Sequence, residues 1–266
     1  MRLDQYLAKE LQTRTRAADA IKQGRVSIAG KTITKPAYEL KEEEQDQIEI
    51  RPAEHDYVSR AGGKLQAAFD AFHIDVKDQC VLDIGASTGG FTDCMLQNGA
   101  KLVYAVDVGY NQLDWKLRTH PQVVCMERTN ARYLTREQIP EPLDFFSVDV
   151  SFISLSLILP ALRSLVREGG EAVCLVKPQF EAGKDKVGKK GVVRDPTIHL
   201  EVLERFLEHA ERADFSVKDI TFSPIKGPEG NIEYLGYLQS GGGTSYVGDL
   251  KTLVEQSHSA WREERS

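Results

Sequence analysis

The chain has 266 residues, 41% of them hydrophobic, and a formal net charge of -6, so it is long enough to bury a core of ordinary size. No apolar run approaches the roughly 20 residues that span a bilayer, which argues against an integral membrane protein. The first residues, MRLDQYLAKELQTRTR, lack the apolar stretch of a secretory leader, so we expect a cytoplasmic protein with no membrane partner. The four cysteines are far apart and form no C-x-x-C pair, which predicts reduced thiols and no metal site.

Charge is distributed unevenly along the chain. Residues 1–38 contain eight Lys or Arg and three Asp or Glu, a net of +5, although the whole chain is acidic. Because phosphate binding requires local positive potential, this basic segment is the expected nucleic-acid-binding part.

The first 53 residues are expected to form a small α+β module. Apolar residues recur at helical spacing twice before Gly24, which predicts two short helices. The stretch RVSIAGKTIT alternates apolar and polar residues around Gly30, as a β-hairpin does, and a short strand is expected at 47–50. Residues 54–59 are the expected linker to a second domain at 60–266.

From Cys80 onward, apolar strands alternate with helical segments. This order is typical of a Rossmann-like, doubly wound and mostly parallel α/β sheet. The runs VKDITFSPI and IEYLGYL predict an antiparallel hairpin at the sheet edge. Helices are expected at 90–99, 154–168 and 197–212. Strands are expected at 79–84, 102–107, 122–126, 143–149 and 171–176.

A glycine-rich turn follows the first of these strands, in VLDIGASTGGFT, where backbone amides and a helix N-terminus can approach a ligand. The four-residue step from Gly85 to Gly89 departs from the G-x-G-x-x-G that cradles a pyrophosphate, and it suits a ligand that carries an amino acid. Asp83 is expected to bind the ammonium group of that ligand, Asp107 its ribose hydroxyls and Asn130 its adenine edge. This combination predicts S-adenosylmethionine rather than NAD. The expected cofactor residues are Asp83, Gly85, Ser87, Thr88, Gly89, Gly90, Phe91, Asp107, Asn130 and Asp149. The simpler alternative is that the glycines only form a tight turn and the aspartates only cap helices.

Four polar residues are candidates for catalysis. Asp149 and Lys177 end two strands at the carboxyl edge of the sheet, where ligands bind, while Lys64 precedes the first strand and Glu233 opens the last. Methyl transfer to a ribose 2′-hydroxyl requires an oriented oxygen and a base for its proton. We assign the base to Lys177, because burial and a second lysine disfavour the charged form of a lysine. Lys64 and Glu233 are expected to orient the hydroxyl and Lys177, and Asp149 to balance charge near the sulfonium. Taken singly, Lys64 and Glu233 are equally well explained as exposed surface residues.

The chain resembles the TlyA family, known as hemolysin A or 16S/23S rRNA 2′-O-methyltransferase, whose catalytic domain is FtsJ-like. The resemblance covers nearly the whole chain and is carried in order by VSRAGGKL, DIGASTGGFTD, VDVSFISL, VKPQFEAGK, GVVRD and GNIEYL. Residues 1–53 are similar to the alpha-L RNA-binding module of a small-subunit ribosomal protein, through RLDQYL, TRTRAADAIKQGRVSIAGK and Lys35. The resemblance implies a catalytic tetrad and a cytidine ribose in rRNA, free or in ribosomal subunits, as the substrate. The tetrad is Lys64, Asp149, Lys177 and Glu233.

Basic residues in two segments are candidates for phosphate contacts that position RNA without reading its sequence. One segment is the second helix with the turn after it, and the other is the loop AGKDKVGKKGVVRD, which we expect to be mobile and to grip the substrate. An ordinary solvated basic face is the alternative. The residues are Arg14, Arg16, Lys22, Arg25, Lys184, Lys189 and Lys190.

Three other hypotheses are weighed against RNA 2′-O-methylation. A methyltransferase for a base amino group usually carries an Asn/Asp-Pro-Pro-Tyr-like motif, whereas this chain has DVSF at that position. A non-catalytic RNA-binding assembly factor would not need all four candidate catalytic residues. A secreted cytolysin would need a leader and a membrane-active segment. The oligomeric state is not predicted.

Overall fold

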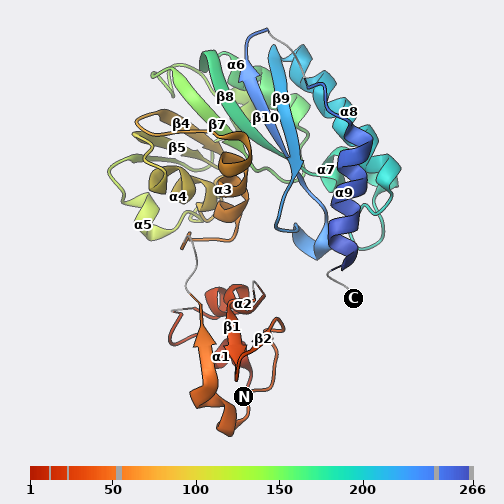
Figure 1. Ribbon diagram of the computed structural model, residues 1–266. Helices are drawn as coiled ribbons and strands as arrows, with labels where there is room; N and C mark the ends of the chain where they lie inside the picture. The colour runs from red at the N-terminus through yellow and green to blue at the C-terminus, as the bar shows by residue number, and fades with distance from the viewer. Residues whose placement is uncertain (12, 23, 52–55, 243–245, 264–266) are drawn as a thin grey trace. The chain divides into compact units, whose positions relative to one another are not determined.

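The chain forms two compact units, Met1–Arg60 and Ala61–Ser266, in a computed structural model that describes residues 1–11, 13–22, 24–51, 56–242 and 246–263 (Figure 1). Pro52 and residues 54 and 55 of the expected linker lie outside the described residues. Within the described ranges, no helix has both the length and the apolar character needed to cross a membrane.

The N-terminal unit combines two short helices with a three-stranded antiparallel sheet of order β2-β1-β3. The predicted hairpin forms, and Ala29 and Gly30 at its turn both have positive φ, as a type I′ turn requires. Leu3, Leu7 and Ile21 are buried against β1 in a small core of their own. The elements are α1 (Leu3–Tyr6), α2 (Arg14–Lys22), β1 (Val26–Ile28), β2 (Lys31–Ile33), the 3-10 helix η1 (Glu42–Gln47) and β3 (Ile48–Ile50).

The second unit is built on a seven-stranded sheet of order β6-β5-β4-β7-β8-β10-β9. The first five strands in this order are parallel, and β10 is antiparallel to both β8 and β9. The predicted doubly wound sheet with an antiparallel edge hairpin is thereby confirmed. The strands are β4 (Cys80–Ile84), β5 (Leu102–Val106), β6 (Val123–Met126), β7 (Leu143–Val148), β8 (Val166–Val176), β9 (Phe215–Phe222) and β10 (Tyr234–Ser240).

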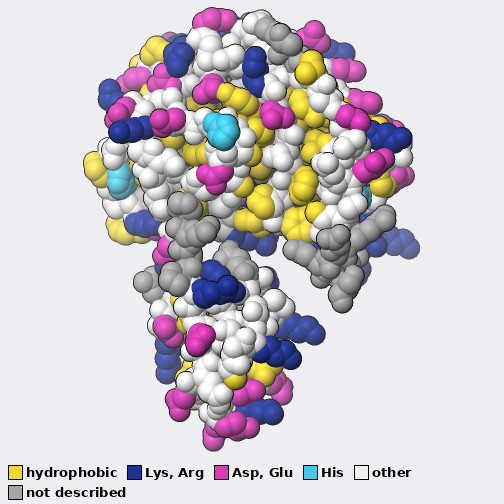
Figure 2. All heavy atoms as spheres, viewed as in Figure 1, with side chains coloured by type: hydrophobic (Ala, Val, Ile, Leu, Met, Phe, Trp, Pro, Cys, Tyr) yellow, Lys and Arg dark blue, Asp and Glu magenta, His cyan; other side chains and the backbone are white. Residues whose placement is uncertain are grey.

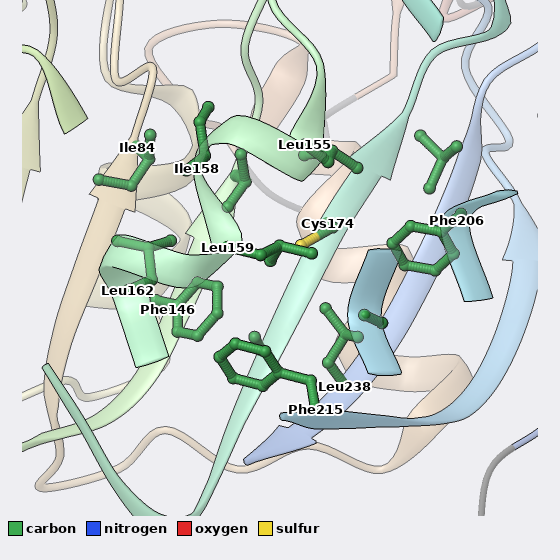
Figure 3. Close-up of a cluster of buried hydrophobic side chains, with 14 of the residues drawn as sticks. Ile84, Phe146, Leu155, Ile158, Leu159, Leu162, Cys174, Phe206, Phe215 and Leu238 are labelled. Carbon is green, nitrogen blue, oxygen red and sulfur yellow. The ribbon is translucent and has the colours of Figure 1, made fainter. Parts of the chain in front are cut away.

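Helices cover both faces of this sheet because successive side chains of each strand point to opposite faces. Phe146 packs with helices α6 and α8 in the large hydrophobic cluster shown in Figure 3, and its ring meets Phe215 edge to face with centroids 5.6 Å apart. The preceding residue, Phe145, meets Phe69 of α3 on the other face. The helices are α3 (Ala61–Phe72), α4 (Gly90–Gln97), α5 (Trp115–Arg118), α6 (Leu159–Arg163), α7 (Pro178–Glu181), α8 (Pro196–Arg212) and α9 (Leu250–Glu263).

The prediction of one helix over 154–168 is wrong. The segment contains a 3-10 helix, Leu155–Leu157, followed by α6, and β8 already begins at Val166. Pro160 is accommodated because it lies in the first turn of α6, where a missing N–H costs nothing. Strand β8 begins five residues before the expected start at 171. Its first residue, Val166, pairs with Leu143 before a register shift in β7.

A buried histidine joins three elements of the second unit. His199 on α8 is 0% exposed; its Nε2 lies 2.9 Å from the carbonyl oxygen of Val193 and its Nδ1 lies 3.0 Å from the hydroxyl of Tyr234 on β10. That hydroxyl also lies 3.0 Å from Ser257 Oγ on α9. Since a carbonyl only accepts, Nε2 donates and the neutral ring accepts from Tyr234. Burial lowers the pKa of His199 to about 4.

We predict that His199 makes the second unit sensitive to acid. Between pH 6.5 and pH 4 the unfolded chain binds a proton on this ring that the folded chain does not, so the free energy of unfolding falls by about 3 kcal/mol as pH is lowered. Chemical unfolding of the native chain and His199→Asn at several pH values should show a shallower acid slope in the variant. The exposed His73→Asn is the control, and equal slopes in all three proteins would contradict the prediction.

Candidate active site

The glycine-rich turn passes directly over the end of β7. Gly85 and Gly89 have φ values of +83° and +102°, in the left-handed region that glycine tolerates best. A Cβ on Gly85 would lie 2.3 Å from the carbonyl oxygen of Asp149, and a Cβ on Gly89 would lie 2.3 Å from Leu117 Cδ1. The glycines therefore do more than shorten a turn, because they let the backbone approach its neighbours more closely than any other residue would.

Asp107 fastens this turn to the end of β5. Its two carboxylate oxygens accept hydrogen bonds from the backbone N–H of Ser87, at 2.8 Å, and of Gly109, at 2.7 Å. A carboxylate has about four acceptor positions, so capacity remains for ribose hydroxyls. Ser87 and Thr88 are exposed at the turn, whereas Gly90 and Phe91 are buried in the first turn of α4.

Asp83 is enclosed rather than presented to a ligand. It is 0% exposed, and its carboxylate accepts hydrogen bonds from Thr92 Oγ1 at 2.7 Å and Ser147 Oγ at 3.2 Å. Burial raises the pKa of Asp83 to about 7, and the charge of Asp149 adds to this effect while the hydroxyl of Thr92 opposes it. The structure therefore places Asp83 behind the turn, where it connects β4, α4 and β7.

Asn130 serves locally as a helix cap. Its side-chain oxygen accepts from the backbone N–H of Arg132 at 3.1 Å, at the start of the 3-10 helix Ala131–Tyr133. The residue is exposed, so its amide N–H₂ is accessible to a ligand. Contact with an adenine edge stays a prediction.

Lys177 and Asp149 form a partly buried ion pair at the carboxyl edge of the sheet. They follow the adjacent parallel strands β8 and β7, and Lys177 Nζ lies 2.5 Å from Asp149 Oδ1. The Lys177 side chain is 9% exposed and the Asp149 side chain 18%. Ser151 Oγ accepts a longer hydrogen bond from the same ammonium, at 3.5 Å. Partial burial strengthens such a pair because little water screens it.

Lys64 and Glu233 form a second, more deeply buried ion pair. Lys64 Nζ on α3 donates to Glu233 Oε2 at 2.6 Å, and the two side chains are 7% and 0% exposed. Tyr234 is in register with Val176 across the antiparallel strands β10 and β8, so Glu233 emerges opposite Lys177. The fold therefore brings all four candidate catalytic residues to one edge of the sheet.

Comparison with known proteins matches both units of the chain. FtsJ-like methyltransferases match residues 57–240, more than half of the chain, and the S4 domain matches residues 1–46.

The chain belongs to the FtsJ-like methyltransferase family. YqxC of Bacillus subtilis is 45% identical over 273 residues, which cover 100% of this chain and 96% of YqxC. The 16S/23S rRNA (cytidine-2′-O)-methyltransferase TlyA of Mycobacterium tuberculosis is 42% identical over 86% of this chain and 85% of TlyA. A solved structure from Streptococcus thermophilus, which carries the name hemolysin, matches with a TM-score of 0.79 and 44% identity over 100% of this chain and 98% of that chain. The chain is therefore a methyltransferase, and its methyl donor is S-adenosylmethionine.

The candidate RNA-binding residues of the S4 domain lie on α2 and the turn after it. Arg14 Nε donates to the buried Asp4 at 3.0 Å, Arg16 lies 4.0 Å from Asp56, and Arg25 donates to a backbone carbonyl. Lys22 is exposed. Figure 2 shows Lys and Arg side chains interleaved with Asp and Glu on the visible face of this domain, so its basic excess does not form one uninterrupted patch there.

The lysine-rich loop of the methyltransferase is exposed at Lys184, Lys189 and Lys190 but is anchored at its end. The amide group of the buried Asn231 donates to the carbonyl oxygen of Gly191 and accepts from the N–H of Val193. The expectation of a mobile loop therefore applies at most to the part before Gly191.

Sequence reasoning missed three residues of the site. Gln179 donates from Nε2 to Glu233 Oε1 at 2.8 Å, and Ser151 contacts Lys177. Gly227 leaves room for Glu233, because a Cβ there would lie 2.1 Å from Glu233 Oε1. The segments KPQFE and DVSF were noted, but a neutral side chain gives no indication of its partner until the strands are paired.

We predict that Gly85→Ala weakens S-adenosylmethionine binding more than about tenfold. The Cβ adds an overlap with Asp149 to a left-handed strain of roughly 1–2 kcal/mol. Isothermal titration with S-adenosylmethionine measures the loss. Gly30→Ala is the matched control, because it has a similar φ of +77° and open space around the Cβ. Equal affinities of the two variants would contradict the steric argument.

Proposed function

We propose that this methyltransferase transfers a methyl group from S-adenosylmethionine to the ribose 2′-hydroxyl of a cytidine in 16S rRNA, 23S rRNA or both, in the cytoplasm. The observation that carries the proposal is the pair of buried ion pairs, Lys177–Asp149 and Lys64–Glu233, at one edge of the sheet. The name of the Mycobacterium tuberculosis relative supports the choice of cytidine and rRNA. Free rRNA and ribosomal subunits are both candidate forms of the substrate.

The turn after β4 and Asp107 suit the donor S-adenosylmethionine. Gly85 and Gly89 keep side chains away from the turn, and the free acceptor positions of Asp107 suit the hydroxyls of a ribose. Asp83 supports the turn from behind, and Asn130 lies exposed after β6. When bound, the donor supplies an electrophilic methyl group.

Lys177 acts as the base in the proposed mechanism. In the proposed reaction Lys177 first gives its ammonium proton to solvent. The neutral amine then takes the proton of the acceptor ribose hydroxyl as the methyl group is transferred, and Asp149, 2.5 Å away, holds the ammonium that is formed again. The Lys64–Glu233 pair orients the hydroxyl from the opposite strand β10. Because all four groups are held in place before the substrate arrives, little reorganisation is needed during transfer.

We predict that Lys177→Met lowers methyl transfer to rRNA by about 10²- to 10⁴-fold, the usual effect of losing a general base. Transfer from labelled S-adenosylmethionine to each ribosomal subunit and to free rRNA measures the rate, and ribose-methylation sequencing locates the product. Cofactor affinity should be unchanged. The exposed Lys251→Met on α9 is the control. Unchanged transfer by Lys177→Met would exclude Lys177 as the base, and a mark on a nucleobase would overturn the proposed reaction.

The S4 domain is proposed to bind the RNA backbone through guanidinium groups held by Asp4. Asp4 is 3% exposed, and it accepts two hydrogen bonds from Arg2, at 2.9 and 3.0 Å, and one from Arg14. The two arginine side chains remain 44% and 52% exposed, so each can still meet a phosphate. The hydrogen bond from Arg2 is the main cause that lowers the pKa of Asp4 to about 2, so Asp4 is ionised at neutral pH. Phosphate contacts are also proposed for Arg16, Lys22, Arg25, Lys184, Lys189 and Lys190.

We predict that Asp4→Asn weakens RNA binding although it removes a negative charge. Without the Asp4 carboxylate the two arginines lose their common anchor, and the slope of log K against log salt decreases in magnitude by about 1 to 2. Filter binding to rRNA over a range of salt concentrations measures both quantities. The exposed Glu10→Gln removes the same charge without moving an arginine and should strengthen binding slightly. Tighter binding by both variants would contradict the anchoring role of Asp4.

A further inference from the structure

Gln179 contacts the Lys64–Glu233 ion pair from the segment that carries Lys177. It lies in α7, two residues after Lys177, and its Nε2 donates to Glu233 Oε1 at 2.8 Å. Lys64 occupies the other oxygen of the same carboxylate, Oε2, at 2.6 Å. Glu233 is therefore held on both oxygens, once by α3 and once by the segment that carries Lys177.

The amide group of Gln179 has only one sensible orientation. A carboxylate only accepts hydrogen bonds, so the N–H₂ group must face Glu233 and the amide oxygen must point away from it. That oxygen, Oε1, is buried and has no hydrogen-bond partner among the described residues. Most buried acceptors in proteins have a donor, so this oxygen is a candidate to receive one from a ligand.

The acceptor ribose carries a donor of the required kind. Inside an RNA chain the 3′-oxygen is esterified, so the 2′-hydroxyl is the single free hydroxyl of each ribose. Gln179 contacts Glu233 and follows Lys177 by two residues, so it lies at the same edge of the sheet as the four residues that are proposed to surround this hydroxyl. We propose that Gln179 is a positioning residue for methyl transfer, which holds Glu233 with its amide N–H₂ and accepts a hydrogen bond from the acceptor 2′-hydroxyl with its amide oxygen.

The inference rests on the proposed function and adds a reason for substrate selection. A deoxyribose cannot donate to Gln179 Oε1 and would leave this buried oxygen without a partner, which disfavours DNA. A 2′-O-methyl ribose cannot donate either, so the product loses the same contact and is released more easily. The hydrogen bond forms before transfer and is given up when the hydroxyl proton passes to Nζ of Lys177.

Two substitutions of Gln179 separate positioning from mere packing. Gln179→Met keeps the approximate shape but can neither donate nor accept. Gln179→Glu places a carboxylate against Glu233, which raises the pKa of the pair, and the protonated form of the new residue again has one donor and one acceptor. We expect kcat for rRNA to fall by about 10- to 100-fold in Gln179→Met at every pH between 6 and 9. In Gln179→Glu, kcat relative to the native enzyme should rise as pH is lowered.

The control variant is the exposed Gln256→Glu on α9, whose kcat should stay close to the native value. The affinity for S-adenosylmethionine and the thermal midpoint of the Gln179 variants should also stay close to native values. A kcat of Gln179→Met within twofold to threefold of the native enzyme would overturn the inference, and so would a pH-independent ratio for Gln179→Glu. Native activity measured in the same experiment tests the proposed function separately, since its failure would show as no ribose mark at all.

A binding cycle isolates the amide oxygen. The probe is an rRNA fragment that contains the nucleotide mapped with the native enzyme, made with either ribose or 2′-deoxyribose at that position. We expect the deoxy substitution to weaken binding to the native enzyme by about fivefold and to leave binding to Gln179→Met unchanged. An equal loss for both enzymes would show that Gln179 does not meet the hydroxyl.

Discussion

The burial of four charged side chains at one edge of the sheet is the constraint on which the rest of the catalytic unit depends. Lys177, Lys64 and Glu233 are largely removed from water and Asp149 is 18% exposed, so an unpaired charge at a buried position would be strongly destabilising. The fold must therefore place a carboxylate next to each of the two lysines. The order β7-β8-β10 sets Asp149 and Glu233 on either side of β8, which Lys177 follows, and helix α3 supplies Lys64 to Glu233.

The same constraint explains features that look unrelated along the chain. Gly227 must lack a side chain because Glu233 occupies the space, and Gly85 must lack one because the turn crosses the backbone of Asp149. Asp83 is buried next to Asp149, and burial together with that neighbouring charge raises its pKa. The cofactor turn is thus packed directly against the backbone of the catalytic edge.

In the S4 domain the arrangement of the surface charges depends on a few buried residues. Its core is small, and its basic residues are mixed with acidic ones on the surface. The buried Asp4 converts part of this scattered charge into a defined arrangement, because it fixes two arginines and leaves both partly exposed. A buried acid can therefore contribute to the binding of an anion.

The sequence by itself determined the α/β alternation, the edge hairpin and the glycine-rich turn, because hydrophobic periodicity and glycine placement are local properties. It also singled out Lys64, Asp149, Lys177 and Glu233 as one set of candidates, and the resemblance to a family implied the same four as a catalytic tetrad. The segment 154–168 was misjudged, since its apolar residues suit a helix and a buried strand equally well. Only the tertiary structure decided which lysine pairs with which carboxylate, that Asp83 is enclosed, and that Gln179 contacts Glu233. These facts depend on strand order and register, which bring together residues up to 169 positions apart, and no local pattern encodes such contacts.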